Sequence, residues 1–327
     1  MTSPAPETPT LSVVVVTYQT RDEVLACLAS LRDCAPAVTH ETFVVDNAST
    51  DGAVEAVAAH FPDVELIARS TNGGFAVANN EALTRARGRY TLLLNSDTLV
   101  LPGALEAMVE FLDAHPRTGL VGCRLVGADG GTDPSAGGLP GLRVQVASWF
   151  GLKRLVPAGA LRRALRVGPL RRALDAAAGG YFVPATSDSE PREVDFLSGA
   201  CVLVRREVWE QVGLLDERIF LYLEDADICR RAAQAGWRLH YLPYAAIVHV
   251  GGRSFAARSG GQTYHLSRER ATSLVYYFRK HHGRRGALAI RALIVVSVLP
   301  RLVFARSPQR RALLRAVLRI AVSPSSR

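Results

Sequence analysis

The fold is decided by the stretch RYTLLLNSDT, which occupies residues 89–98. Its Tyr90–Leu94 run is short and apolar, which is typical of a buried strand. The run ends in Asn95, Ser96 and Asp97, which predicts oxygen ligands at the carboxyl edge of an open α/β sheet. Oxygen ligands beside a diphosphate suit a hard cation such as Mg²⁺ or Mn²⁺. The alternative interpretation is a polar turn after a core strand, since this composition is common in turns.

Three more apolar runs precede this stretch, and each is followed by a segment with helical spacing. The predicted strands are Leu11–Val16, Thr42–Val45 and Val64–Ala68. Four strands alternating with helices predict a doubly wound, mostly parallel sheet flanked by helices. The first strand-to-helix turn contains no glycine, which argues against the dinucleotide-binding fingerprint.

Polar residues follow each of these strands, and they are the candidates for holding a nucleotide. Thr17 and Tyr18 follow the first strand, and the second strand closes in Asp46. An acidic side chain in that position can accept from a base N–H or a ribose hydroxyl. After the third strand come Asn72 and the pair Gly73-Gly74, which let the backbone approach a ligand closely.

Three carboxylates lie within four positions at Glu224, Asp225 and Asp227. Their mutual repulsion can raise one pKa and create a proton acceptor near neutral pH. On a helix, Glu224 and Asp227 share a face while Asp225 points elsewhere. The alternative is an acidic helix N-terminus that the dipole favours, followed by Arg230 and Arg231.

His249 closes an apolar strand and precedes two glycines. A lone histidine is usually structural, but at a strand end facing a metal edge it is a candidate ligand.

The charge is concentrated at the C-terminus. Twelve Lys and Arg but no Asp or Glu lie between residues 279 and 327, so the net charge of +9 leaves −3 for the rest of the chain. This predicts an anionic membrane surface as a partner. The nucleic-acid alternative lacks aromatic interleaving and a recognised fold. A second basic segment, residues 153–172, reads equally as an amphipathic helix or as a solvated linker.

Five cysteines form no C-x-x-C pair, and the first ten residues are polar and proline-rich. An odd count without a framework indicates a reducing compartment, and we see no signal peptide. The expected location is cytoplasmic, peripherally associated with the inner face of the cell membrane.

Seven segments in order resemble glycosyltransferase family 2, and within it bacterial rhamnosyltransferase-like cell-wall enzymes. They are VVVVTY, VVDNASTDG, NGGFAVANN, YTLLLNSD, VDFLSGACVLVRRE, GLLDERIFLYLEDADICRRAAQAGW and VHVGGRS. The resemblance covers about residues 11–254 and implies a GT-A fold, in which a Rossmann-like sheet is flanked by helices. It implies a catalytic domain over residues 1–278, with 127–191 as a variable insertion or acceptor region. Residues 279–327 would form a basic amphipathic, membrane-associating tail.

The resemblance also implies roles for individual residues. The nucleotide-sugar donor would be held by Thr17, Tyr18, Asp46, Asn72, Gly73, Gly74, Asn95 and Ser96. Asp97 would bind a divalent metal (Mg²⁺ or Mn²⁺), with His249 as a further ligand. Asp225, with Glu224 beside it, would be the general base. Asn95 stands where the family's metal motif usually begins with Asp, and its amide oxygen is a weaker, neutral ligand.

The implied activity is inverting transfer of a sugar, from dTDP-rhamnose or a UDP-sugar, to a saccharide or lipid-linked acceptor. Two rival interpretations are a nucleotidyltransferase and a non-catalytic, membrane-bound nucleotide-sugar-binding homologue. The turn after the first strand lacks the Gly- and Lys/Arg-rich loop of the first rival. The presence of Asp97, Asp225 and His249 argues against the second.

Overall fold

A computed structural model describes residues 8–34, 37–149, 190–250 and 268–323. The chain divides into two compact units. The first comprises Met1–Ala136, Pro184–Glu217 and Glu224–Ser254, and the second comprises Gly137–Val183, Arg218–Leu223 and Phe255–Arg327. The predicted boundary at residue 278 stays a prediction. The basic segment 153–172 lies outside the described residues.

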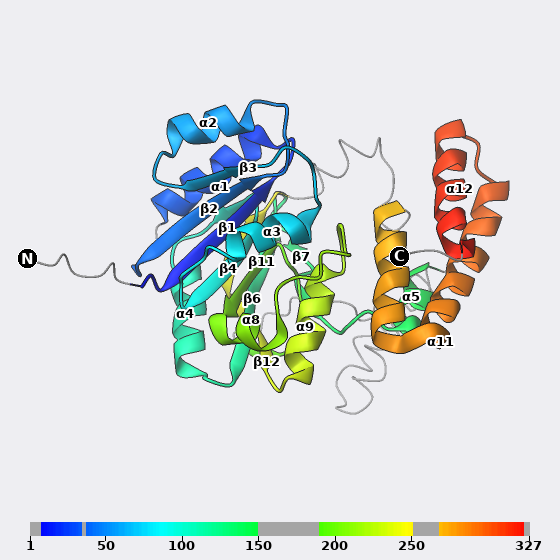
Figure 1. The fold of residues 1–327 in the computed structure, drawn as a ribbon. Helices are drawn as coiled ribbons and strands as arrows, with labels where there is room; N and C mark the ends of the chain where they lie inside the picture. Colours follow the sequence, from blue (N-terminus) through cyan, green and yellow to red (C-terminus); the bar gives the residue numbers. More distant parts are fainter. Residues whose placement is uncertain (1–7, 35–36, 150–189, 251–267, 324–327) are drawn as a thin grey trace, which may run out of the picture. The chain divides into compact units, whose positions relative to one another are not determined.

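The first unit is built on a ten-stranded sheet whose main path runs β3-β2-β1-β4-β11-β6-β12-β5, with β7 paired to β6 and β9 to β12 (Figure 1). The strands are β1 (Leu11–Thr17), β2 (His40–Asp46), β3 (Glu65–Ala68), β4 (Tyr90–Asn95), β5 (Thr98–Val100), β6 (Thr118–Gly127), β7 (Thr132–Asp133), β9 (Arg192–Glu193), β11 (Cys201–Arg205) and β12 (Arg238–His249). The first four strands are parallel, as are β6 and β12, while β11 runs antiparallel between β4 and β6. Two short strands, β8 (Ala136–Gly137) and β10 (Phe196–Leu197), form a separate pair.

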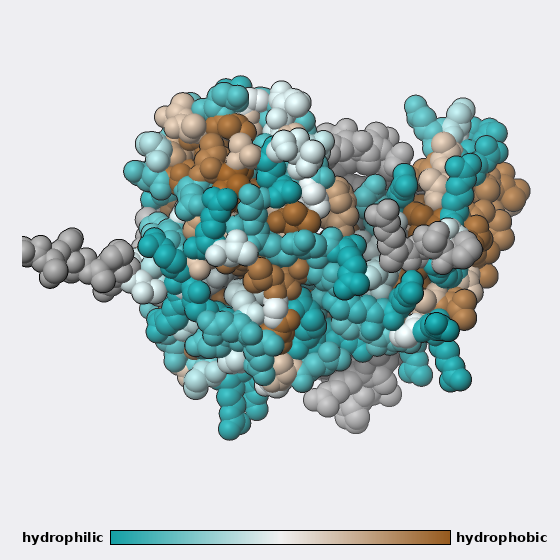
Figure 2. Space-filling view, viewed as in Figure 1, coloured by the Kyte–Doolittle hydropathy of each residue, from teal (hydrophilic) through white to brown (hydrophobic). Residues whose placement is uncertain are grey.

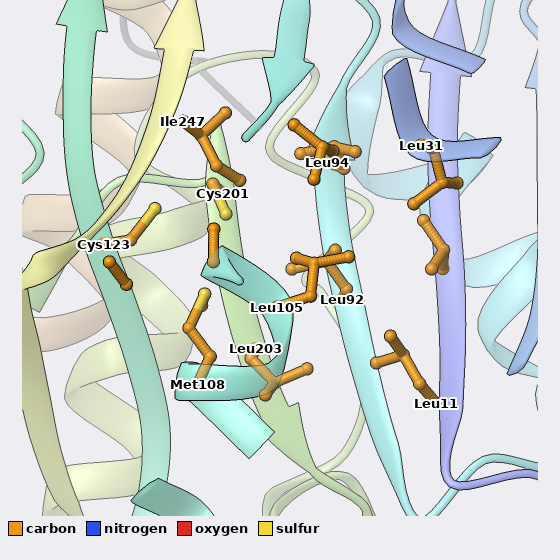
Figure 3. Close-up of a cluster of buried hydrophobic side chains, with 14 of the residues drawn as sticks. Leu11, Leu31, Leu92, Leu94, Leu105, Met108, Cys123, Cys201, Leu203 and Ile247 are labelled. Carbon is orange, nitrogen blue, oxygen red and sulfur yellow. The ribbon is translucent and has the colours of Figure 1, made fainter. Parts of the chain in front are cut away.

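Helices cover both faces of this sheet. They are α1 (Arg21–Asp33), α2 (Ala53–His60), α3 (Phe75–Leu83), α4 (Ala104–Ala114), α8 (Arg206–Val212) and α9 (Glu224–Gln234). On one face, the apolar sides of α1 and α4 pack on alternate strand residues, among them Leu92, Leu94 and Leu203 (Figure 3). On the other face, Phe75 of α3 and Ile228 of α9 lie against strand residues of the opposite parity. This alternation explains why β1 and β4 are mostly apolar on both faces, since strands covered on both faces have no solvent side.

The predicted mixed α/β sheet is confirmed, with differences in detail. The segment VDFLSGACVLVRRE, residues 194–207, contains β10, β11 and the start of α8, and the chain turns at Gly199–Ala200. Strand β12 continues through Pro243, because a register irregularity between Leu242 and Ala246 removes the ladder position that proline cannot fill.

The second unit contains α5 (Leu142–Trp149), α11 (Arg268–Val303) and α12 (Pro308–Val322). Helix α11 is kinked at Gly283, whose φ of 66° is in the left-handed region that favours glycine. The Arg291 side chain of α11 donates to the carbonyl oxygens of Ala321 and Ser323 at the end of α12. These two bonds tie the end of α12 to α11, which packs against it, and they satisfy carbonyls that a helix C-terminus leaves unpaired. Among the described residues, α11 is long and apolar enough to cross a membrane by length and composition, and 33% of its most apolar window is buried.

Candidate functional site

The carboxyl ends of three adjacent parallel strands meet at one edge of the sheet. Thr17 ends β1 opposite Asp46, which ends β2, and Val16 lies opposite Asn95 at the end of β4. Parallel pairing therefore brings the predicted nucleotide and metal residues to the same edge, where open α/β sheets bind ligands.

A chain of hydroxyl groups links β1 to the turn after β4. The Thr17 hydroxyl lies 2.9 Å from that of Thr20, which lies 3.1 Å from that of Ser96. All three residues are buried. The hydroxyls of Thr17 and Ser96 thus both lie within hydrogen-bonding distance of the Thr20 hydroxyl. Thr20 was not predicted as a site residue. Its signal was a Thr just before the first helix.

Asp46 has one carboxylate oxygen engaged and one open. Its Oδ2 accepts from the Ser49 amide at 2.8 Å. Its Oδ1 is buried and has no hydrogen-bond partner among the residues that the structure describes. A buried carboxylate oxygen without a partner is costly, so a ligand N–H or hydroxyl would complete it. Tyr18, at the end of β1, is half-buried.

The glycine turn before α3 is pinned by Asn47. The Asn47 Oδ1 accepts from the Gly73 amide at 3.0 Å, and its Nδ2 donates to the Gly74 carbonyl at 3.1 Å. Asn72 Oδ1 accepts from the Gly74 amide at 3.0 Å, and Gly74 has φ of 89°. Asn47 was not predicted as a site residue, although it directly follows Asp46. Its side chain fixes the turn that begins α3, whose N-terminus favours anions.

Helix α3 carries two further buried asparagines. Asn80 exchanges hydrogen bonds with the backbone of Leu215, at 2.9 and 3.0 Å, and so holds the loop that follows α8. Asn79 donates to the Phe75 carbonyl, and its own Oδ1 has no partner among the described residues. Asn80 therefore has a structural role, whereas the Oδ1 of Asn79 is available to accept a hydrogen bond.

Asp97 and His249 meet at the other end of this edge. His249 Nε2 lies 3.5 Å from Asp97 Oδ1, and the Val250 amide donates to the Asp97 carbonyl at 2.9 Å. On its other side, His249 Nδ1 lies 3.4 Å from Asp133 Oδ2. Asp133 ends β7 and was not predicted. Burial lowers the pKa of His249, but the hydrogen bonds and charges of Asp97 and Asp133 outweigh burial and leave that pKa above its usual value.

The donor set fits a hard or borderline divalent cation. Two ligands about 2.1 Å from such an ion and at right angles lie about 3.0 Å apart, so the Asp97–His249 spacing needs little change. The described residues contain no group of three or more His, Cys, Asp and Glu side chains arranged to hold a metal. Two protein ligands would therefore leave the remaining positions to a diphosphate and water. Asn95 uses its backbone at this point, since its amide donates to the Ala200 carbonyl at 3.0 Å.

The acidic cluster opens helix α9, directly after two residues in the left-handed region. Tyr222 and Leu223 have φ of 68° and 75°. Such conformations cost about 1–3 kcal/mol each and gather at functional sites. Asp225 accepts from the Gly199 amide at 3.3 Å and from the Ala226 amide at 2.8 Å.

The three carboxylates have different surroundings. Glu224 is buried, its Oε2 has no partner among the described residues, and burial, with the charges of Asp225 and Asp227, raises its pKa well above the usual range. Asp227 is fully buried and forms a 2.8 Å ion pair with Arg231. Arg231 also donates to the carbonyls of Val212, Gly213 and Leu214. Asp227 therefore orients an arginine that closes α8, while Asp225 remains partly exposed.

The acidic cluster and the nucleotide edge are linked through the Ser198–Ala200 turn. A Cβ on Gly199 would lie 3.5 Å from Asp225 Cβ and 3.8 Å from the Phe75 ring. Phe75 directly follows the Gly73-Gly74 turn, and Ala200 is bonded to Asn95. One glycine thus lies among the first residue of α3, the end of β4 and the start of α9.

Comparison with known proteins gives a consistent picture. A family model described as "Glycosyltransferase like family 2" matches residues 8–263. The chain is 29% identical over 311 residues to the N-acetylglucosaminyl-diphospho-decaprenol L-rhamnosyltransferase of Mycobacterium tuberculosis H37Rv, covering 88% of this chain and 94% of that protein. It is 35% identical over 80 residues to rhamnosyltransferase WbbL of Escherichia coli K12, covering 24% of this chain and 30% of that protein.

Among solved structures, the chain resembles the mannosyltransferase PcManGT from Pyrobaculum calidifontis, determined in complex with GDP-Man and Mn²⁺. The TM-score is 0.54 at 20% identity, covering 97% of this chain and 87% of that one. This likeness confirms the predicted fold class.

Proposed function

Since the chain belongs to glycosyltransferase-like family 2, we propose that it moves a sugar with inversion from a nucleotide-diphosphate sugar to a saccharide or lipid-linked acceptor. The donor class is dTDP-rhamnose or a UDP-sugar, and the process is cell-wall or polysaccharide synthesis. The M. tuberculosis relative, which matches over 94% of its own length, is named as an N-acetylglucosaminyl-diphospho-decaprenol L-rhamnosyltransferase. This name supports dTDP-rhamnose as the donor and a lipid-linked sugar as the acceptor.

The convergence of complementary groups at one sheet edge carries this proposal. Asp46 offers an unpaired acceptor to a base or ribose, and the Gly73-Gly74 turn offers backbone at the start of α3. Thr17, Tyr18, Asn72, Asn95 and Ser96 line the same edge. Asp97 and His249 would hold Mg²⁺ or Mn²⁺, which when bound offsets the charge that develops on the leaving diphosphate.

Asp225 is proposed as the base that takes the proton of the acceptor hydroxyl. It is the most open of the three carboxylates, because Glu224 is buried and Asp227 is committed to Arg231. Burial and the charges of Asp225 and Asp227 raise the pKa of Glu224 well above its usual range, which favours the neutral acid beside Asp225. One base acting with direct displacement gives inversion at the anomeric carbon.

We propose that the enzyme works in the cytoplasm at the inner face of the membrane, where a lipid-linked acceptor would be reached. The basic C-terminal region supports this location, since cytoplasmic leaflets carry anionic lipids.

The test is a panel of nucleotide sugars offered to purified full-length protein with Mg²⁺ or Mn²⁺. One or a few donors should raise the melting temperature and be consumed in the presence of a polyprenyl-diphosphate-linked sugar. Binding without turnover would favour the non-catalytic homologue, and release of diphosphate from a nucleoside triphosphate would favour a nucleotidyltransferase.

A further inference from the structure

Helix α11 exposes a stripe of apolar residues along one side. Among the most exposed large hydrophobic residues are Leu288 (67%), Val296 (57%) and Val303 (78%). With Ala292 and Leu299, which are also exposed, they are spaced by four, four, three and four residues. This spacing places them on one face of a helix, over about 22 Å of its length.

The opposite face of this half of α11 is buried. Ile290, Ile294 and Val298 are fully buried, as are Leu314 and Val317 of α12, the helix that packs against α11. The exposed stripe is therefore not needed to hold the hairpin together. Hydrophobic side chains gather on the surface over these helices (Figure 2). Contiguous apolar surface of this kind marks an interaction site in soluble proteins.

Helix α12 contributes a cationic stripe to the same hairpin. Arg311, Arg315 and Arg319 are exposed at intervals of four residues. Arg284 and Arg285 precede the apolar stripe, and no acidic residue occurs from position 279 to the C-terminus. An apolar face accompanied by unopposed cations complements the boundary between acyl chains and anionic headgroups.

We propose that the α11–α12 hairpin binds the surface of an anionic lipid bilayer, with the Leu288–Val303 stripe inserted among the acyl chains. The exposed Phe304, at 82%, lies at the turn between the helices and inserts with it. Arg291 stays inside the hairpin on the α12 carbonyls, so the stripe itself carries no charge into the lipid. This proposal deepens the membrane location proposed above, and it predicts surface binding and not a crossing.

The experiment is sedimentation of full-length protein with vesicles of phosphatidylcholine, with or without 30% phosphatidylglycerol. Val296→Glu combined with Val303→Glu changes two exposed positions and should weaken binding at least tenfold, since charges replace inserted apolar groups. Arg311, Arg315 and Arg319 changed together to Gln should weaken binding to the anionic vesicles alone, by about fivefold for each arginine. Tyr244→Glu, at a 49% exposed site on β12, is the matched control and should bind as wild type does.

Circular dichroism and gel filtration of each variant show whether it keeps its fold, and carbonate extraction separates surface binding from crossing. Wild-type binding by the double glutamate variant would overturn the proposal, and so would resistance to carbonate extraction. A dimer that dissociates in the glutamate variant would assign the stripe to a second copy of the chain. Loss of vesicle binding with unchanged sugar transfer to a soluble acceptor leaves the proposed activity intact.

The carboxylate of Asp133 lies behind His249, on the side of the ring away from Asp97. Gly127 of β6 pairs with His249 of β12, and β7 brings Asp133 to the far side of β6. A side chain on Gly127 would enter this space, because its Cβ would lie 2.9 Å from Asp129 Oδ1 and 3.6 Å from Asp133 Oδ1. The missing side chain leaves room for Asp133 to reach the imidazole.

We infer that Asp133 is a positioning residue for the proposed metal ligand His249. When Nδ1–H is donated to Asp133, the lone pair of Nε2 is free and directed to the side of Asp97. A carboxylate behind a ligating histidine fixes both its tautomer and its ring orientation. This inference rests on the proposed metal role of Asp97 and His249.

The test is the affinity of full-length protein for Mn²⁺, measured by electron paramagnetic resonance with UDP or dTDP present. Asp133→Asn should weaken Mn²⁺ binding by about 10–100-fold, and Asp133→Glu should restore part of it. Asp129→Asn removes an equal charge from the same turn and should leave binding near wild type. The ¹⁵N shifts of the His249 ring should show the Nδ1–H form in wild type and a mixture in Asp133→Asn.

If Asp129→Asn and Asp133→Asn weakened Mn²⁺ binding equally, the loss of one negative charge near the site would explain both results, and the inference would be overturned. Wild-type affinity in Asp133→Asn would overturn it as well, while the proposed metal role would stand. Failure of the wild-type protein to bind Mn²⁺ would overturn both.

Discussion

At the scale of single residues, the three carboxylates of the acidic cluster have different surroundings, although their side chains are chemically alike. Asp227 is buried against Arg231, Glu224 is buried without a partner for Oε2 among the described residues, and Asp225 is bonded to two backbone amides. Neighbours one to three residues apart thus carry structural, electrostatic and proposed catalytic functions.

Asp225→Asn keeps the size of the side chain and removes the proposed base. We expect turnover to fall by about 10²–10⁴-fold, the usual contribution of proton transfer, with donor affinity nearly unchanged. Asp227→Asn should affect turnover much less and lower the melting temperature instead, because it breaks a buried ion pair. Steady-state kinetics with donor-binding measurements check both. Near-normal turnover in Asp225→Asn alongside an inactive Glu224→Gln or Asp227→Asn that remains folded would assign the base to that neighbour.

Glu224 should make stability depend on pH. Its pKa is raised in the folded state, so its contribution to stability is fully present below the unfolded pKa of about 4.3 and is lost as pH rises towards the folded pKa. Glu224→Gln mimics the neutral acid at every pH. We expect the variant to melt a few degrees above wild type at pH 7.5 and at the same temperature near pH 4. Thermal melts across this range check it, and parallel curves for the two proteins would show that Glu224 is not buried in the neutral form.

At the scale of elements, the glycine turn before α3 depends on a side chain from a different strand end. The Asn47 side chain accepts from the Gly73 amide and donates to the Gly74 carbonyl, which also accepts from the Ala78 amide of α3. The turn and the helix N-terminus behind it are therefore fixed before any donor binds.

Asn47→Ala should loosen this turn. Removing the amide leaves the Gly73 N–H and the Gly74 carbonyl without this partner, at a cost of about 1–3 kcal/mol for a buried group. Donor affinity should fall, and amide hydrogen exchange at Gly73 and Gly74 should accelerate. Thr84→Ala, at an exposed position near the end of the same helix, is the control. Unchanged exchange and affinity in Asn47→Ala would mean that the turn is held by other contacts.

Much of this arrangement was predictable from sequence, and the missing parts share one physical cause. Strand periodicity and the polar strand ends predicted the sheet, and parallel pairing brings Thr17, Asp46 and Asn95 together at its edge. Asp133 and Asn47 were missed because their importance depends on which strands become neighbours. Local patterns do not specify that order, or the insertion of β11 between β4 and β6.

At the scale of the whole molecule, the residues proposed for sugar transfer and those proposed for membrane binding belong to different units of the chain. All the predicted site residues belong to the first compact unit, and the apolar and cationic stripes belong to the second. Residues 218–223, which directly precede the proposed base, also belong to the second unit, where Ser273 donates to the Leu221 carbonyl at 2.8 Å.

This contact predicts a link between helix α11 and turnover. Ser273→Ala removes the bond that holds the loop before α9, so we expect lower turnover with little change in donor affinity. Thr272→Ala, at the adjacent exposed position, is the control. A drop in donor affinity with turnover intact would contradict the expectation.

The anomeric configuration of the product is the sharpest test of the proposed inverting transfer of a sugar. Full-length protein is incubated with the donor selected from the panel and a polyprenyl-diphosphate-linked sugar, and the anomeric coupling of the product is read by nuclear magnetic resonance. The account predicts a new glycosidic bond of anomeric configuration opposite to that of the donor, and its loss in Asp225→Asn. A product that retains the donor configuration would contradict it.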